Sequence, residues 1–437
     1  MAWHPEQCGA DGMTRQHRLF YGWVILAIGF ATIICGYVCR NTFSVFYPAI
    51  VDEFGWTRGN TGLIFSVNSL VYGLFAPVAG ALVDRFKTRY VLAAGALLIG
   101  IGMALCSIAT TTWQFIILYG VVAGIGLSIA GWVPVSTLVA NWFSRRRALA
   151  FGILGAGLGM SYLSAYVAQR VIASFGWQTA YVAIGAFIAS LIVPISILFV
   201  RRFPSDKGLF PDGMKAEEAS SAAALRERQV VSTGWHRTEW TLKAAARTRQ
   251  FWLMFLIFMT AMGIVEQLAI SHQVYFYMDA GYDALTAAKL YGLFGICFAL
   301  GNLSGALSDR IGRERFFSPT ALVCTAFVSL LFLMNDTSAS WLPPLIAVGF
   351  GLTFGSFPCV LNATLADLFH GKHYGSIAGV MVLGFALGGT VSAWLAGYLH
   401  DVTGTYTSTY ALLIVALIAT SAMMWIVAPR KVNPLRK

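Results

Sequence analysis

Two charged side chains lie inside otherwise apolar stretches of this sequence, Arg40 in the first long apolar run and Glu266 in the seventh. A charge within a membrane-spanning helix costs free energy, so such residues usually have a function. A guanidinium offers a fork that can bind a carboxylate in two places, and a carboxyl in a low-dielectric site can take up and release a proton. The pair therefore suggests binding of an anion linked to movement of a proton.

Arg40 shares a helical face with Tyr37, Ser44 and Tyr47, because their spacing follows the helical period. Three interpretations of Arg40 stay open. It could reach the membrane surface from near the outer end of its helix, pair with Glu266 for structural reasons, or receive an anionic substrate. If Arg40 and Glu266 do pair, substrate could displace the acid and favour its protonation.

Glu266 is the only carboxylate well inside an apolar run, and Gln273 and Tyr277 share its helical face. His272 is rotated away from that face. Glu266 is the first candidate for proton coupling and His272 the second, although a single histidine near a helix end is often a hydrogen-bonded structural residue.

Other polar side chains in the apolar runs could contact cargo or only join helices. They are Asn68, Tyr72, Tyr119, Trp132, Tyr162, Tyr291, Asn302, Asn362 and Ser392. No nucleotide-binding loop, metal-ligand cluster or pairing of a nucleophile with a base occurs, so neither a cofactor nor an enzymatic activity is expected.

Composition indicates that these residues lie in a membrane protein. The 437-residue chain is 57% hydrophobic and 11% charged, which indicates an integral membrane protein. Its net charge of +11 does not indicate nucleic-acid binding, because the basic residues lie in short segments between apolar runs.

The apolar runs predict twelve membrane spans. Their limits are 21–47, 60–83, 89–109, 113–140, 148–173, 178–200, 250–278, 286–308, 316–334, 341–368, 374–400 and 406–428. We expect an N-terminal segment (1–20), a first six-helix bundle (21–200), a linker (201–249) with a short surface helix, a second bundle (250–428) and a C-terminal segment (429–437).

The basic residues also predict the orientation. Of the 30 Lys and Arg residues, 26 lie on the side that both termini and the linker share. The positive-inside rule places that side in the cytoplasm, and we expect a monomeric functional unit in the cell membrane, or in the inner membrane of a bacterium.

The two halves repeat each other at an offset of 225 to 229 residues, as in GALVDRFKTR from Gly80 and GALSDRIGRER from Gly305. A repeat of six spans predicts two bundles related by an axis along the membrane normal, with substrate between them.

The repeated loop resembles the cytoplasmic motif of the major facilitator superfamily. Its residues are Gly80, Asp84, Arg85 and Arg89 in the first half, and Gly305, Asp309, Arg310 and Arg313 in the second. The resemblance implies a gating role for them, with glycine allowing close helix approach and the charges pairing across the bundle interface, and it implies that spans 1, 4, 7 and 10 line a central cavity.

WFSRRRALAFGILGAG, residues 142–157, and FYGWVI, residues 20–25, resemble signatures of the monocarboxylate and oxalate/formate branch. That branch often carries a substrate arginine in span 8, but here span 8 has neither Arg nor Asp. Asn41 stands where the branch has a span-1 lysine, with Arg40 one residue earlier.

The resemblance implies an organic-anion transporter, monocarboxylates favoured, that works by proton symport and alternating access. Its candidate substrate-binding residues are Arg40, Asn41, Ser44, Tyr119, Gln273, Tyr291 and Asn302. The alternatives are an anion antiporter of the oxalate/formate type, a sensor on a transporter scaffold and a proton-driven drug-efflux pump, which is disfavoured because span 4 lacks an intramembrane arginine.

Overall fold

The computed structural model describes residues 20–143, 146–214, 240–334, 336–369 and 374–427, without the side chains of residues 84, 147, 148, 306, 309 and 375. The expected terminal segments and the predicted surface helix around 217–228 lie almost wholly outside these ranges. Within them every regular element is helical.

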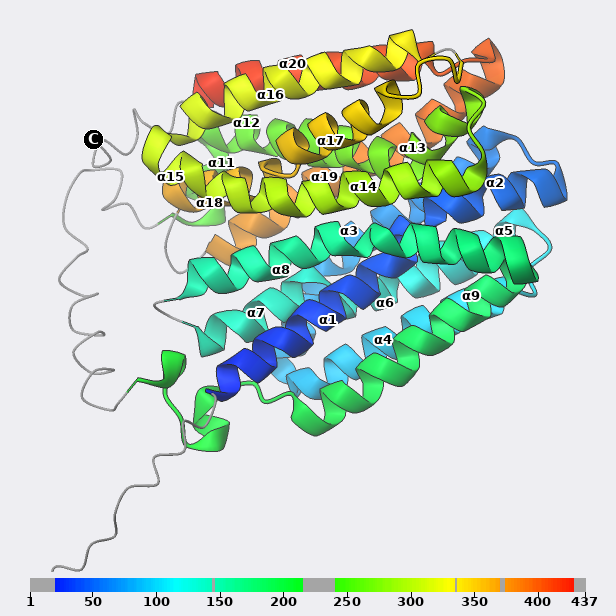
Figure 1. Ribbon diagram of the computed structural model, residues 1–437. Coiled ribbons are helices and arrows are strands. Elements are labelled where there is room, and N and C mark those ends of the chain that lie inside the picture. Colours follow the sequence, from blue (N-terminus) through cyan, green and yellow to red (C-terminus); the bar gives the residue numbers. More distant parts are fainter. Residues whose placement is uncertain (1–19, 144–145, 215–239, 335, 370–373, 428–437) are drawn as a thin grey trace, which may run out of the picture.

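Eleven helical stretches in the described ranges are long and apolar enough to cross a membrane. One of them, Leu149–Phe199, has 51 residues, and a straight helix of that length would measure roughly 75 Å against a hydrocarbon core of roughly 30 Å. Gly176 interrupts it with φ 82° and ψ 162°, a backbone conformation that favours glycine. Figure 1 shows the chain reversing there. The stretch therefore crosses twice, and the predicted twelve crossings are confirmed.

The first six crossings are built from ten helical segments. They are α1 (Tyr21–Asn41) and α2 (Phe43–Phe54); α3 (Arg58–Arg85); α4 (Thr88–Cys106); α5 (Thr112–Phe115), η1 (Ile116–Ala123), α6 (Gly124–Ala130) and α7 (Trp132–Trp142); and α8 (Arg147–Ser161) with α9 (Leu163–Phe199), which supply crossings five and six. The described parts of the linker contain η2 (Pro204–Lys207), η3 (Pro211–Gly213) and α11 (Leu242–Ala246).

The last six crossings follow the same plan. They are α12 (Arg249–Ile257), η4 (Phe258–Glu266) and α13 (Gln267–Asp279); α14 (Ala284–Ser304), η5 (Gly305–Leu307) and α15 (Ser308–Ile311); α16 (Arg313–Ser329) and η6 (Leu330–Leu333); α17 (Leu342–Phe354) and α18 (Phe357–Leu368); α19 (Tyr374–Thr403); and α20 (Thr407–Val427).

The two halves form two layers in Figure 1, with α1, α4 and α6–α9 below and α12, α14, α16, α17 and α20 above. The start of α1, the end of α20 and the linker helices η2 and η3 lie at the same end, which we call the terminal face. The other end is the opposite face. The predicted all-α membrane fold of two six-helix bundles is confirmed.

Crossings 1, 4, 7 and 10 are all interrupted. Crossing 1 breaks at Thr42, ahead of Pro48, which has no N–H to donate to the preceding turn. Crossing 4 contains the π-helical η1 and breaks at Gly131, crossing 7 contains the π-helical η4, which ends at Glu266, and crossing 10 breaks next to Gly355. Interrupted membrane helices free backbone groups and re-aim side chains, and they are tolerated where they line a site or a cavity.

The two halves contact each other closely through small residues. A Cβ placed on Gly73 of α3 would lie 2.1 Å from the Cβ of Ala386 in α19, and one on Gly159 of α8 would lie 2.6 Å from the backbone nitrogen of Ala299 in α14. Such contacts let helices approach to backbone distance where no hydrophobic drive holds them together. They set the depth at which polar residues of the two halves meet.

Candidate functional site between the two halves

Arg40 lies at the break in crossing 1. It is the penultimate residue of α1, and the Thr42 hydroxyl donates to the Val38 carbonyl at 2.7 Å, which satisfies a backbone acceptor where the helix is interrupted. The Arg40 side chain is completely buried. It therefore neither extends to the membrane surface nor contacts water, as a side chain that reaches out of the bilayer would.

The Arg40 guanidinium joins the two halves. Its Nη2 donates to the Ser69 hydroxyl in α3 and to Gln267 Oε1 in α13, both at 2.6 Å. The guanidinium also lies 5.1–5.4 Å from the centroids of three aromatic rings, those of Phe65, Tyr72 and Phe385. Cation–π contacts of this kind stabilise a desolvated cation without neutralising its charge.

Part of the hydrogen-bonding capacity of Arg40 is unused. A guanidinium has five N–H donors, and the two described hydrogen bonds both start at Nη2. The Nε and Nη1 atoms are buried and have no hydrogen-bond partner among the described residues. Buried donors without partners are rare and costly, so this charge is placed where an additional acceptor would stabilise it.

Glu266 is not the direct partner of Arg40. No ion pair joins these two described residues, and the amide of Gln267 occupies the position expected for the acid. Adjacent residues of a helix point about 100° apart, and the π-helical η4 shifts the register of crossing 7 just before this point. The offset between the sequence repeats therefore predicted the depth at which crossing 7 meets Arg40, but not which side chain of crossing 7 points toward it.

Glu266 and Arg40 nevertheless share one environment. Arg40 interacts with Glu266 through space, and both charges act electrostatically on the same four tyrosines, which are Tyr37, Tyr72, Tyr162 and Tyr291. The hydroxyls of Tyr37 and Tyr72 lie 3.2 Å apart. Glu266 and Tyr37 are partly exposed, whereas Arg40 is not.

Asn41 and Ser44 extend this polar region. Asn41 Nδ2 donates to the Ser161 hydroxyl of α8 at 2.6 Å, while its buried Oδ1 has no partner among the described residues. The Ser44 hydroxyl donates to the Asn41 carbonyl at 3.1 Å and also contacts the hydroxyl of Tyr291. Asn41 and Ser44 thus join the break in crossing 1 to α8 and α14.

Two of the expected substrate-binding residues make hydrogen bonds within the second half. Gln273 donates from Nε2 to the Tyr277 hydroxyl at 3.2 Å and keeps a buried Oε1 without a described partner. The Tyr291 hydroxyl donates to the carbonyl of Ile270 at 3.3 Å. Gln273 therefore retains an acceptor, and Tyr291 ties α14 to α13 next to Ser44.

The remaining candidates lie elsewhere. The Tyr119 hydroxyl donates to the Cys39 carbonyl at 3.0 Å, behind α1, so this tyrosine joins helices. Asn302 packs against Gly155, whose added Cβ would lie 2.8 Å from Asn302 Oδ1, and it is about 16 Å along α14 from Tyr291. Asn302 is therefore not brought to Arg40, whereas Tyr119 bonds the carbonyl of the residue that precedes Arg40.

His272 is completely buried, and both of its ring nitrogens have partners. Nε2 lies 2.9 Å from the Ala393 carbonyl and Nδ1 lies 3.0 Å from the Tyr406 hydroxyl. A carbonyl only accepts, so Nε2 carries a proton and Nδ1 accepts one from the tyrosine in the neutral ring. These hydrogen bonds correspond to the structural role that was considered for His272 as an alternative to proton coupling.

The repeated loop motif is at the terminal face in both halves. Arg313 Nε donates to Asp367 Oδ2 at 3.0 Å and Nη1 donates to the Ser308 hydroxyl at 2.6 Å, and both of these partners belong to the second half. The side chains of Asp84 and Asp309 lie outside the described set, and Arg85 and Arg310 are exposed.

The motif glycines differ from each other in packing. A Cβ on Gly305 would lie 2.8 Å from the Cβ of Cys359, whereas one on Gly80 would meet its nearest atom, in Val133, at 3.9 Å. Close helix approach therefore explains Gly305 and not Gly80. Arg89, the last residue of the first-half motif, lies partly buried near the start of α4.

Charged residues that the sequence analysis left unassigned join the halves at the opposite face. Arg58 at the start of α3 forms two hydrogen bonds with Asp279, at 2.6 and 2.8 Å, and His400 Nε2 lies 3.3 Å from the same carboxylate. Asp401 accepts from the backbone nitrogens of Arg58 and Gly59 at 2.9 and 2.6 Å. We call Arg58, Asp279, His400 and Asp401 the opposite-face cluster.

Aromatic residues reinforce that cluster. The Arg58 guanidinium lies 4.0 Å from the centroid of the Tyr275 ring, and the Tyr47 hydroxyl donates to the Arg58 carbonyl. Ion pairs, backbone hydrogen bonds and aromatic contacts thus join the two halves between Arg40 and the opposite face. No local signal reveals these pairs, because the partners are 221 and 342–343 residues apart in sequence.

Comparison with known proteins agrees with the fold and with the sequence resemblance. The family model described as "Major Facilitator Superfamily" matches residues 29–392. Monocarboxylate transporter 12-B of Danio rerio is 26% identical over 428 residues, which cover 93% of this chain and 87% of that protein. Monocarboxylate transporter 2 of Homo sapiens is 25% identical over 419 residues, covering 94% and 86% respectively.

A solved structure supports the same fold. The crystal structure of a bacterial homolog of the human lysosomal transporter Spinster, in an inward-facing and unoccupied conformation, superposes with a TM-score of 0.64. It covers 95% of this chain and 96% of its own chain at 17% identity. At that identity the likeness concerns the architecture of the helices.

Proposed function

Since the chain belongs to the major facilitator superfamily, and is therefore a multi-pass membrane transporter rather than an enzyme, we propose that it carries small organic anions, monocarboxylates above all. The observation that carries this proposal is the buried, unneutralised Arg40 guanidinium with Nε and Nη1 unpaired. A carboxylate would accept from these donors and form charge-assisted hydrogen bonds in a site without water. The similarity to monocarboxylate transporters supports the same substrate class.

The residues beside Arg40 would orient the rest of the substrate. Asn41 and Gln273 each keep a buried amide oxygen that can accept from a substrate hydroxyl. Ser44 and Tyr291 provide hydroxyls next to them. The surrounding aromatic rings favour a short, partly apolar chain over a strongly hydrated one.

Glu266 is the proposed proton carrier. Glu266 lies in the electrostatic environment of Arg40, and a bound anion would cancel the positive charge that the acid experiences there. Binding of substrate would then promote protonation of Glu266, so that anion and proton cross together. Because Gln267 rather than Glu266 contacts Arg40 directly, substrate would act on the acid through space without breaking an ion pair.

Transport would proceed by alternating access of the two halves. The opposite-face cluster closes one side, and the partly exposed Glu266 and Tyr37 lie toward the other. The distribution of Lys and Arg supports a cytoplasmic terminal face in the cell membrane. The cluster would then be the extracellular closure.

Uptake into proteoliposomes tests the substrate proposal. A panel of mono- and dicarboxylates is offered to the wild type, to Arg40→Ala and to Arg170→Ala, which removes an exposed arginine at the opposite face. We expect saturable uptake of a monocarboxylate that is lost in Arg40→Ala and retained in Arg170→Ala. If the wild type takes up a carboxylate and Arg40→Ala takes it up equally well, the proposed role of Arg40 is wrong.

Proton coupling is tested separately, with a pH-sensitive dye inside the vesicles. Substrate should acidify wild-type vesicles but not Glu266→Gln vesicles, and Glu53→Gln, which neutralises an exposed acid, should behave as the wild type. Undiminished proton-coupled uptake in Glu266→Gln contradicts the proposed role. Efflux from loaded vesicles that requires external anion would instead support the antiport alternative.

A further inference from the structure

A basic cavity opens at the terminal face, away from Arg40 and Glu266. Its volume is about 420 Å³, and it lies where the loop between α3 and α4 meets the end of α9 and the start of the linker. This volume falls within the usual range for small-molecule sites, roughly 300–1,000 Å³. The transport cycle proposed above makes no use of this cavity.

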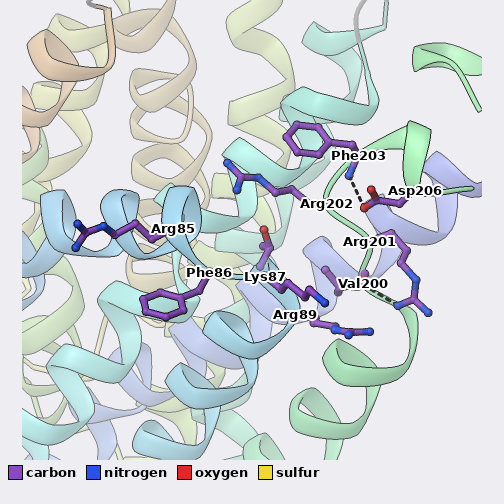
Figure 2. A pocket seen from close by; sticks show the side chains of 10 residues that line it. Arg85, Phe86, Lys87, Arg89, Val200, Arg201, Arg202, Phe203 and Asp206 are labelled. Carbon is purple, nitrogen blue, oxygen red and sulfur yellow. Dashed lines mark hydrogen bonds between the residues drawn. The ribbon is translucent and has the colours of Figure 1, made fainter.

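The lining of the cavity is strongly cationic. It contains five basic side chains and one acid, and the basic ones are Arg85, Lys87, Arg89, Arg201 and Arg202. In Figure 2, Lys87, Arg89 and Arg201 extend to one side, and Arg85 and Arg202 point to the other. The acid, Asp206, accepts from the Phe203 backbone nitrogen at 3.1 Å and caps η2. Its single negative charge offsets only one of the five basic charges.

Two residues that line the cavity also carry buried polar atoms without described partners. The Thr88 hydroxyl is buried with no described hydrogen-bond partner, and so is the Nε of Arg89. Both residues belong to the first turn of α4, a 19-residue helix whose N-terminal end carries a partial positive charge. Basic side chains next to a helix N-terminus are also found in phosphate sites.

The same cavity also has an apolar rim. Phe86 and Phe203 line it and are 57% and 41% exposed, and the neighbouring Tyr90 and Phe199 are also exposed. Aromatic residues at the end of membrane spans mark the boundary between hydrocarbon and water. A ligand seated here would place an anionic group on the cations and an apolar part along the aromatic rings.

We propose that this cavity binds the phosphate headgroup of an anionic phospholipid from the leaflet at the terminal face. The charge, the unpaired Thr88 and Arg89 groups and the exposed aromatic rim together fit an amphiphilic phosphodiester better than a free phosphate ion. The bound headgroup would bridge the α3–α4 loop and the end of α9, and so connect the first-half loop motif to the linker.

The test measures lipid binding by the full-length protein in detergent. Native mass spectrometry titrates phosphatidylglycerol and phosphatidylcholine against the wild type, Lys87→Gln/Arg89→Gln and Lys243→Gln/Arg249→Gln. The last pair removes the same two charges from exposed sites on the terminal face outside the cavity. Inorganic phosphate at matched ionic strength forms a separate competition arm.

We expect the tightest phosphatidylglycerol site to weaken about 25-fold in Lys87→Gln/Arg89→Gln, or about fivefold for each cation. Lys243→Gln/Arg249→Gln should leave it unchanged, and phosphatidylcholine should not reproduce it. Equal weakening in both double variants would mean general surface attraction and would overturn the site. Displacement of the lipid by inorganic phosphate with the same dependence on Lys87 and Arg89 would overturn the lipid assignment.

Folding of each variant is checked by size-exclusion chromatography and by its apparent unfolding temperature. If Lys87→Gln/Arg89→Gln does not fold, the comparison is repeated with Arg201→Gln as the cavity variant and Arg247→Gln as the control. Arg247 is exposed and lies outside the cavity. The expected loss is then about fivefold. An unchanged affinity in Arg201→Gln contradicts the proposal.

Discussion

Asp279→Asn should open the opposite face. The carboxylate of Asp279 accepts both hydrogen bonds from Arg58 and lies next to His400, so it is the charge that joins crossings 2, 7 and 11. Asparagine has nearly the same shape but no charge and a single acceptor oxygen. The substitution therefore weakens the opposite-face cluster without creating a cavity or removing an aromatic contact.

The size of the effect follows from the contacts. A hydrogen bond to a charged group contributes about 1.5–3 kcal/mol, and asparagine loses one of the two that Arg58 forms. The Asp279 side chain is 32% exposed and that of Arg58 is 19% exposed, so solvent reduces the loss to about 1–2 kcal/mol. The population open at this face should rise about 5- to 30-fold relative to the closed one.

Electron–electron double resonance between spin labels measures that population. Labels at Asn60→Cys and Thr405→Cys sit on exposed positions of the two halves at the opposite face, after Cys8 and Cys359 are replaced by serine. Asp283→Asn is the matched control, because Asp283 is exposed and caps α14 through Thr286 at 3.0 Å. Asparagine caps helices as well as aspartate does.

We expect a longer distance component to grow in Asp279→Asn and to stay unchanged in Asp283→Asn. An unaltered distance distribution in Asp279→Asn would show that the backbone contacts of Asp401 and the packing of α3 against α19 are sufficient to close this face. Equal growth in both variants would show a general charge effect. Either result would refute the assignment of closure to the Arg58–Asp279 pair.

Two further predictions concern packing and the anion site. Gly159→Ala should lower the apparent unfolding temperature, because the new Cβ would lie 2.6 Å from the Ala299 nitrogen and overpacking costs about 1–3 kcal/mol. Gly152→Ala should leave the unfolding temperature unchanged, because a Cβ there would meet no atom within 4 Å. Equal unfolding temperatures of the two variants would contradict the prediction. Gln267→Glu should raise the KM for anions about 10-fold or more, because a carboxylate beside Arg40 competes with substrate for a charge-assisted bond, while Gln267→Leu should raise it less. Uptake kinetics in proteoliposomes measure both, and an unchanged KM in Gln267→Glu would place the substrate away from Arg40.

Much of the fold could be predicted from local signals. Apolar runs of membrane length indicated all twelve crossings, because the thickness of the bilayer imposes a minimum length on each helix. The helix ends were less predictable. Crossing 1 was expected to end at residue 47 but continues to Phe54, where Gly55 takes φ 62° and ends the helix. A helix can continue beyond the apolar run because its backbone satisfies itself in water as well.

The candidate site was predicted in part. Helical periodicity grouped Arg40 with Ser44, and the structure interrupts the helix between them at Thr42 and joins Ser44 to the Asn41 carbonyl. It could not distinguish Glu266 from Gln267 as the partner of Arg40, because that choice depends on a rotation of one residue in an interrupted helix. The predicted contact of Tyr119 with substrate stays a prediction, and its hydroxyl donates to the carbonyl of Cys39, the residue before Arg40.

The sequence by itself determined that this protein crosses a membrane twelve times in two related halves and that an arginine and a glutamate lie within the bilayer. Hydrophobicity and helical period are properties of short segments, so they can be read without knowing the fold. Only the tertiary structure decided what each charge meets. Arg40 contacts Gln267 across 227 residues, and Arg58 contacts Asp279 across 221, because such contacts depend on how interrupted helices from different halves pack together.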